Sequence, residues 1–171
     1  MRKSSSPDPW ILPALKNLKA SGEFVVGALS NTVILPEGHP LRREKSASDG
    51  LRDFFDFFVS SAHVGLRKPD PKIYQLALAK ANEFAAAHAQ SDRGKKLGWE
   101  QGVRPAEVVF LDDIGENLRE ARRQGFRTIK VPLGRAYEAV EELEGITRLK
   151  LAGGHPKAPM FPTGNETRAK I

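Results

Sequence analysis

The sequence has no cysteine among its 171 residues, which excludes disulfides and thiolate metal sites and fits a reducing compartment. It also lacks long apolar runs, since none approaches the roughly 20 residues that cross a bilayer. The first nine residues are polar and broken by proline, unlike a secretory signal. We therefore expect a soluble cytoplasmic protein with no membrane partner. The last residues, Ala169, Lys170 and Ile171, faintly resemble a peroxisomal address, so a peroxisomal location is the alternative.

The formal net charge of +6 is the one bulk property that indicates a nucleic-acid partner. The basic residues, however, are spread over separate groups near positions 42–45, 93–96 and 119–123, with no interleaved aromatic residues that would stack on bases. Solvated protein faces explain such groups more simply. We therefore expect no nucleic-acid partner.

Four short apolar runs, bounded by turn residues, alternate with amphipathic stretches along the chain. This alternation is typical of an α/β fold in which helices connect parallel strands. Helical spacing of leucine and isoleucine precedes the first run, and helices are expected at about 71–87, 115–124 and 136–143. The runs predicted as strands are Phe24–Leu29, Phe57–Ser60, Val108–Leu111 and Thr128–Val131.

One domain is expected, over residues 10–150, because a chain of this length buries a single core without staples. Residues 1–9 are predicted to be a disordered N-terminus. Residues 151–171, which are rich in proline and glycine, are predicted to be an irregular tail. The polar, glycine-containing stretch Ser91–Gly102 is predicted to be a surface loop or an insertion before the third strand.

Polar side chains follow three of the four predicted strands. Ser30 and Asn31 follow the first, Lys68 lies beyond the second, and Asp112 and Asp113 end the third. Ligands of open parallel sheets bind beyond the carboxyl ends of the strands. A hydroxyl group, an ammonium group and two carboxylates are therefore expected to meet at one edge.

Each of these residues also has a plainer interpretation. Adjacent carboxylates such as Asp112 and Asp113 suit a hard cation, most simply Mg²⁺, but one of them could merely cap the helix that follows. Lys68 lies next to prolines that restrict its backbone and could neutralise a phosphoryl group, or it could be a surface lysine before a helix. Asn117 could brace the acidic pair or lie exposed. Ser30 and Asn31 could donate to phosphate oxygens or form an ordinary turn.

In chain order, the segments Ala28–Thr32, Val64–Pro71 and Val109–Asn117 resemble motifs two, three and four of the haloacid dehalogenase superfamily. The residues of these motifs are most similar to those of the phosphatase-type domains at the N-terminus of soluble epoxide hydrolases and in acyl-CoA dehydrogenase fusions. The resemblance runs from about Trp10 to about Gly145. It implies a Rossmann-like three-layer α/β/α fold, magnesium as cofactor and a small phosphorylated molecule as substrate.

Carried over by position, the resemblance gives each site residue a role. Ser30 would hydrogen-bond the phosphoryl group, and Asn31 would help to position the substrate. Lys68 would hold the nucleophile and the phosphate together, and Ser30 and Lys68 are counted as catalytic. Asp112 and Asp113 would bind magnesium. Asn117 would support them.

The family's first motif is absent from this sequence. That motif is an Asp-x-Asp at the end of a central strand, where the first Asp attacks phosphorus and the second protonates the leaving group. No Asp-x-Asp occurs in the chain. We therefore expect a core without its first strand and cap, and two strand edges that close together, accept a strand from elsewhere or stay exposed for self-association.

The sequence leaves three functions open. The first is a phosphohydrolase core that is inactive as this chain. The second is a non-catalytic phosphate- or metal-binding remnant with a regulatory role. The third and least favoured is a basic nucleic-acid-binding domain.

Overall fold

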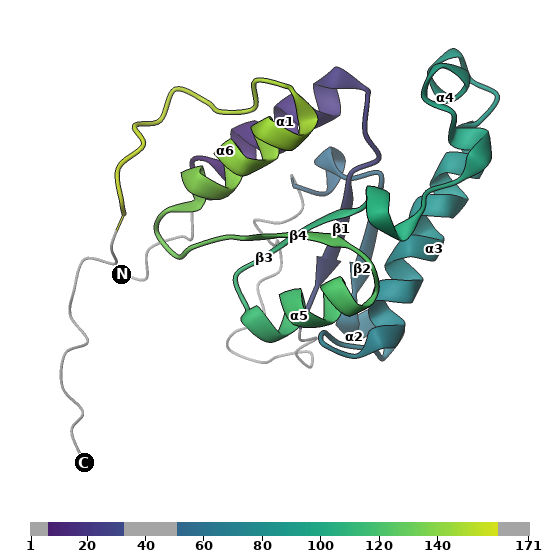
Figure 1. Ribbon diagram of the computed structural model, residues 1–171, viewed down its shortest axis with the longest axis horizontal. Coiled ribbons are helices and arrows are strands. Elements are labelled where there is room, and N and C mark those ends of the chain that lie inside the picture. Colours follow the sequence, from purple (N-terminus) through teal and green to yellow (C-terminus); the bar gives the residue numbers. More distant parts are fainter. Residues whose placement is uncertain (1–6, 33–50, 161–171) are drawn as a thin grey trace, which may run out of the picture.

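The computed structural model describes residues 7–32 and 51–160, and its strands run between helices as an α/β fold (Figure 1). The strands are β1 Gly27–Ser30, β2 Phe57–Ser60, β3 Val109–Asp112 and β4 Arg127–Lys130. The helices are α1 Ile11–Ser21, α2 Ser61–Val64, α3 Pro71–His88, α4 Asp92–Leu97, α5 Gly115–Arg123 and α6 Ala136–Thr147. Short 3₁₀ turns are η1 Arg52–Phe54, η2 Trp99–Gln101 and η3 Pro105–Glu107.

The strands form two separate parallel pairs. β1 pairs with β2, with Gly27 opposite Phe57, and β3 pairs with β4, with Val109 opposite Arg127. The predicted α/β class with parallel strands is confirmed. A Cβ added at Gly27 would lie 2.2 Å from the ring of Phe57, so a larger residue here would require that ring to move.

Helices cover both faces of the strands. Successive side chains of a strand point to opposite faces, so apolar residues on both sides of a strand need a covering layer on each side. In β3, Leu111 packs into the cluster formed with α1 and α6, whereas Phe110 packs into the cluster formed with α3 and α5. α1 and α6 lie side by side on the first of these faces (Figure 1). The first cluster includes Trp10, which is 4% exposed and meets the ring of Tyr137 edge-on at 5.3 Å.

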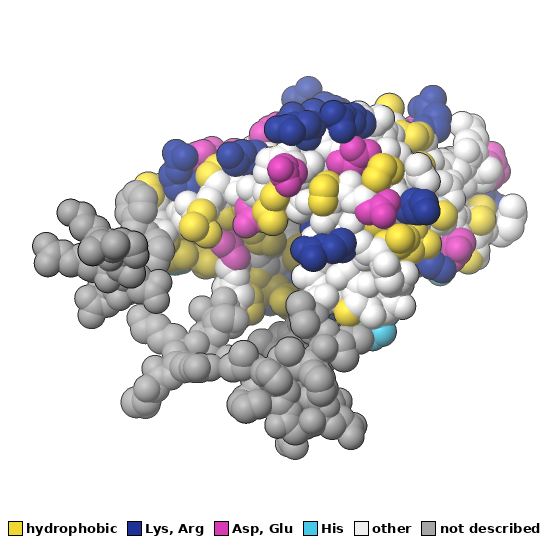
Figure 2. Space-filling model, turned by 90° about the horizontal axis from the view of Figure 1, so that it is seen from below, with side chains coloured by type: hydrophobic (Ala, Val, Ile, Leu, Met, Phe, Trp, Pro, Cys, Tyr) yellow, Lys and Arg dark blue, Asp and Glu magenta, His cyan; other side chains and the backbone are white. Residues whose placement is uncertain are grey.

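Charged side chains occupy the outside of this core. On the face in Figure 2, lysine and arginine side chains stand in several separate groups, with aspartate and glutamate side chains among them. Exposed pairs such as Lys80–Glu83 and Arg135–Glu138 are of this kind. Such pairs contribute little to stability, so the fold depends on the apolar clusters.

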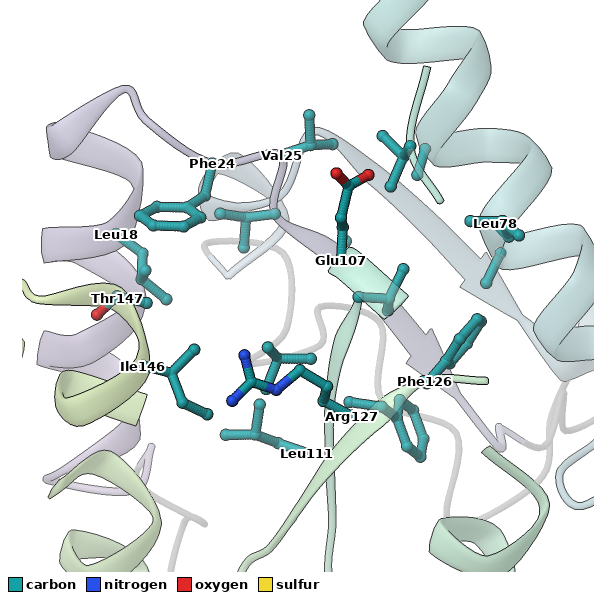
Figure 3. A pocket seen from close by; sticks show the side chains of 18 of the residues that line it. Leu18, Phe24, Val25, Leu78, Glu107, Leu111, Phe126, Arg127, Ile146 and Thr147 are labelled. Atoms are coloured by element: carbon teal, nitrogen blue, oxygen red, sulfur yellow. The ribbon is translucent and has the colours of Figure 1, made fainter. Parts of the chain in front are cut away.

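A cavity of about 750 Å³ separates the two strand pairs. Its lining comes from β1 and β3 and from helices on both faces, including Leu18 of α1, Leu78 of α3 and Ile146 of α6 (Figure 3). The side chain of Arg127 extends into it beside Leu111 (Figure 3). Of the three outcomes expected for these facing edges, closing together is not seen, since within the described residues no ladder joins β1 to β3.

Ser91–Gly102, predicted to be a surface loop or an insertion, is mostly helical, so the loop alternative is wrong. Ser91 caps α4 by accepting from the amide of Gly94 at 3.0 Å. Trp99 is 7% exposed, stacks under the guanidinium of Arg93 and meets Phe84 edge-on, forming a separate cluster beside α3. Burial of this indole stabilises a segment whose polar composition alone indicates a loop.

Residues 148–160 contain no helix or strand. Leu151 is nevertheless fully buried, and its amide donates to Glu144 at 2.7 Å. The rest of the predicted tail and most of the predicted disordered N-terminus lie outside the described residues. None of the helices in the described ranges is both long enough and apolar enough to span a membrane.

Candidate functional site at the carboxyl ends of the strands

A buried ion pair lies at the carboxyl edge of the strands. The ammonium group of Lys68 donates to Oδ2 of Asp112 at 2.6 Å, and the two side chains are 10% and 4% exposed. Lys68 Nζ also lies 5.4 Å from the centre of the Phe110 ring. A buried cation between a carboxylate and an aromatic face has a defined position, as a group that contacts a ligand requires.

The local sequence explains why Lys68 reaches this place. Gly65 ends α2 in a left-handed conformation (φ 70°), which turns the chain before the Arg67-Lys68-Pro69 segment. Asn31, just after β1, then holds the Lys68 backbone twice: Lys68 N donates to Oδ1 at 2.8 Å, and Nδ2 donates to the Lys68 carbonyl at 3.0 Å. Asp70 begins α3 by accepting from the amide of Lys72 at 2.9 Å.

Asp112 is held by donors from three directions. Its Oδ1 accepts from the amide of Ile114 at 2.8 Å, and the Nδ2 group of Asn117 donates to both carboxylate oxygens at 3.1 and 3.2 Å. Asn117 is 2% exposed, so it braces Asp112 rather than lying on the helix surface. Behind it, the hydroxyl of Tyr74 donates to the Asn117 carbonyl at 3.0 Å.

The environment determines how these groups titrate. Burial alone would raise the pKa of Asp112, but donation from Lys68, Ile114 N–H and Asn117 outweighs burial and holds this pKa below its ordinary value. Burial, with the negative charges of Asp112 and Glu120, raises the pKa of Tyr74. At neutral pH the site therefore contains an ionised carboxylate beside a protonated phenol.

Acid should weaken the fold through Asp112. A carboxyl group with a lowered native pKa stabilises the fold above its unfolded pKa of about 3.9, and this contribution is lost as pH falls through the native value. We expect the free energy of unfolding to fall below about pH 4 with a steeper slope than in Asp112→Asn, by up to about 1.4 kcal/mol per pH unit. Urea titrations between about pH 2.5 and 7 measure both slopes. Equal slopes would contradict the assignment.

Ser30 and Asp113, the other two predicted site residues, make no described contact with the Lys68–Asp112 pair. Ser30 ends β1, opposite Ser60 of β2, and among the described contacts its side chain bonds neither Lys68 nor Asp112. Asp113 follows β3 and is exposed. The structure therefore brings together Asn31, Lys68, Asp112 and Asn117, with Ser30 and Asp113 at the same edge.

A hydroxyl cluster beside this group was not anticipated from the sequence. The Oγ of Ser60, a buried residue, contacts the hydroxyl of Thr32 and lies 2.9 Å from Nδ1 of His63, while Ser61 Oγ accepts from the Thr32 amide at 2.9 Å. These contacts tie the ends of β1 and β2 together. The serine pair Ser60-Ser61 at the end of a predicted strand was the available signal.

Magnesium fits these residues only as a two-carboxylate site. Mg²⁺ binds through one or two carboxylates and completes its octahedron with water and phosphate oxygens. The described part of the chain holds no cluster of three acidic or histidine side chains, so Asp112 and Asp113 are the ligands to consider. Each Asp112 oxygen already accepts from two N–H groups, so coordination requires release of one contact, most simply one from Asn117.

These features define an α/β protein with a charged site at the carboxyl edge of its parallel strands, and comparison with known proteins gives its relatives. No model of a protein family matches the sequence. Acyl-CoA dehydrogenase family member 10 of Mus musculus is 32% identical over 151 residues, covering 86% of this chain and 11% of the mouse protein. Bifunctional epoxide hydrolase 2 of Sus scrofa is 37% identical over 101 residues, covering 59% of this chain and 14% of its own length.

A phosphatase also matches. Glyceraldehyde 3-phosphate phosphatase of Methanopyrus kandleri is 27% identical over 136 residues, which cover 79% of this chain and 47% of the phosphatase. A solved structure of an uncharacterised Corynebacterium glutamicum protein is 18% identical, with a TM-score of 0.42 over 60% of this chain and 63% of that one. This structural likeness is too low to add to the assignment. The chain spans at most about half the length of these three sequence relatives.

The sequence relatives include both kinds of protein that the motifs predicted, together with phosphatases. The chain belongs to the haloacid dehalogenase-like hydrolase superfamily.

Proposed function

We propose that this chain provides the phosphate-binding part of a magnesium-dependent phosphohydrolase centre that acts on a small phosphorylated molecule. The buried Lys68–Asp112 pair carries the proposal. A lysine that is fixed by a carboxylate, an aromatic face and a backbone clamp is placed to neutralise a phosphoryl group without further ordering.

Each residue has a part in this proposal. Lys68 contacts the phosphoryl oxygens, and Ser30 donates its hydroxyl to them. Asn31 already bonds the Lys68 backbone through both ends of its amide, so it acts mainly as a positioning residue, with one Nδ2 hydrogen left for substrate. Asp112 and Asp113 hold magnesium, which would neutralise charge on the phosphate when bound.

The chain supplies no group for two steps of the reaction. Attack on phosphorus and protonation of the leaving oxygen belong to the absent Asp-x-Asp in the family pattern. We propose that the 171 residues alone bind phosphate but do not turn over a phosphate ester. The cavity between β1 and β3 supports this view because it lies where the missing central strand would run.

A non-catalytic role is the second candidate. The Lys68–Asp112 pair also favours this candidate. It offers groups that suit a phosphate at the carboxyl edge of the strands, whereas the sequence has no Asp-x-Asp to supply the family's nucleophile. On this view, binding of phosphate or metal is itself the function. On the face in Figure 2 the basic side chains stand in separate groups. Nucleic acid stays the least favoured of the partners that we propose.

Calorimetry with inorganic phosphate, with and without Mg²⁺, tests the binding that both candidates share. Lys68→Ala should weaken phosphate binding at least about tenfold, because a charge-assisted hydrogen bond is worth about 1.5–3 kcal/mol. Lys72→Ala is the matched control, since Lys72 is exposed at the start of α3 and should bind as the parent chain does. Absence of heat with the parent chain, or equal affinity in Lys68→Ala, would contradict the proposal.

A further inference from the structure

Tyr74 lies behind the charged site, between the supports of its two members. It stands in the first turn of α3, shortly after Lys68 in the sequence, and its side chain is fully buried. α3 packs beside α5, and the phenol of Tyr74 reaches α5 across this contact (Figure 1). A fully buried phenol needs a hydrogen-bond partner inside the protein, so the choice of partner indicates what the hydroxyl holds in place.

The Tyr74 hydroxyl supports the acidic member of the site. It donates to the backbone carbonyl of Asn117 at 3.0 Å, in the first turn of α5. The side-chain amide of Asn117 in turn donates to both carboxylate oxygens of Asp112. Burial, with the negative charges of Asp112 and Glu120, raises the pKa of Tyr74, so the hydroxyl keeps its proton and remains a donor at neutral pH. The phenol therefore fixes the helical turn from which Asp112 is held.

The Tyr74 ring supports the basic member of the site. It meets the ring of Phe110 edge-on, with 5.6 Å between the ring centres, and Lys68 Nζ lies 5.4 Å from the centre of the same Phe110 ring. Phe126 also meets the Tyr74 ring edge-on, at 6.3 Å. Because protein interiors are close-packed, a shift of the Tyr74 ring would move Phe110, and with it the aromatic face beside Lys68.

We propose that Tyr74 is a positioning residue of the phosphate site, which holds the cation and the carboxylate at a fixed separation without touching the ligand. Its hydroxyl acts on Asp112 through Asn117. Its ring acts on Lys68 through Phe110. The inference rests on the phosphate binding proposed above, and it matters there because groups that contact a phosphoryl group must be held to within a fraction of an ångström.

Tyr74→Phe tests the role of the hydroxyl, since this change keeps the ring. In calorimetry of the full chain with inorganic phosphate and Mg²⁺, its affinity should fall about three- to tenfold, as expected for loss of one hydrogen bond between neutral groups. Tyr137→Phe is the matched control, because the Tyr137 ring packs beside Trp10 on the opposite face of the strands. Equal affinity of Tyr74→Phe and the parent chain would overturn the inference.

Gln75→Ala is a second control, at the same pair of helices. Its amide donates to Gln124 at 3.3 Å and so forms an exposed bond between α3 and α5. If loosening this helix pair were enough to weaken the site, Gln75→Ala would bind phosphate as weakly as Tyr74→Phe. We expect it to bind as the parent chain does, and equal weakening in the two variants would overturn the specific role of Tyr74.

The route through Asn117 is tested by a double-mutant cycle. In Asn117→Ala the amide that holds Asp112 is gone, so adding Tyr74→Phe should lower the phosphate affinity by less than about twofold further. A side chain that only supports the core would lower the affinity by the same factor in both backgrounds. That additive result would overturn the proposed route.

Solvent exchange of the Asn117 side-chain amide protons gives a test without phosphate. These protons are donated to Asp112, so their exchange, followed by NMR, should become at least about fivefold faster in Tyr74→Phe and stay unchanged in Tyr137→Phe. Unchanged exchange in Tyr74→Phe would overturn the inference. Failure of the proposed function is recognised separately, as absence of phosphate binding by the parent chain while the difference in exchange persists.

Discussion

The 171-residue chain should not hydrolyse p-nitrophenyl phosphate above background in the presence of Mg²⁺, whereas a fusion that restores an Asp-x-Asp strand should gain at least about 10³-fold in rate. Enzymes accelerate reactions by about 10⁶-fold or more, so even an imperfectly placed nucleophile gives a large signal. The reason is chemical: the described site has a cation and carboxylates for a phosphoryl group, but no group placed to attack it. Release of p-nitrophenolate measures the rate.

The fusion joins an apolar strand ending in Asp-x-Asp to residue 9 through a Gly/Ser linker. About 20 linker residues reach roughly 25 Å, which exceeds the length of α1. The same strand ending in Asn-x-Asn is the matched control and should be inactive. Turnover by the unfused chain that disappears in Asp113→Asn would show that another nucleophile exists, and the proposed division of the site would be wrong.

Replacing Lys68 with methionine should lower the free energy of unfolding by about 3–5 kcal/mol. The change keeps much of the side-chain volume but leaves Asp112 ionised and buried without its cation, the situation in which breaking a buried pair is most costly. Asn117 and the Ile114 amide still donate to Asp112, which favours the lower end of this range. Chemical denaturation followed by circular dichroism measures the difference.

Lys80→Met is the control for this substitution. Lys80 pairs with Glu83 on the surface of α3, where both side chains are exposed, so its loss should cost less than about 1 kcal/mol. Equal losses in the two variants would mean that the Lys68–Asp112 pair is no more important to the fold than a surface pair. In the double variant Lys68→Met/Asp112→Leu, much of the stability should return, because the unpaired charge is gone.

The apolar runs predict the strands well but not their ends. The predicted second strand, Phe57–Ser60, has the observed bounds of β2, whereas the first was expected at Phe24–Leu29 and forms at Gly27–Ser30. Apolar character marks residues that are buried, and Phe24 is part of the core cluster beside α1. Ladder bonds need a partner strand, and β2 begins pairing only at Gly27. A single run cannot contain that information.

For the site, too, the sequence predicts which residues lie at the strand ends but not which contacts they make with residues far away in the chain. Polar residues after three of the four apolar runs predicted that groups from three strand ends would share one edge. The clamp of Asn31 on the Lys68 backbone and the approach of Lys68 to Phe110 depend on residues about 40 positions apart in sequence. The buried Trp99 was hidden among polar neighbours for the same reason, since its partner Phe84 lies on another helix.

The two tryptophans lie in different apolar clusters, Trp10 with α1 and α6 and Trp99 with α3 and α4. Each therefore acts as a fluorophore for its own part of the molecule. Because the sequence contains no other tryptophan, Trp10→Phe and Trp99→Phe each leave a single emitter. The chain thus carries built-in optical reporters of whether its two parts melt in one cooperative transition or in succession.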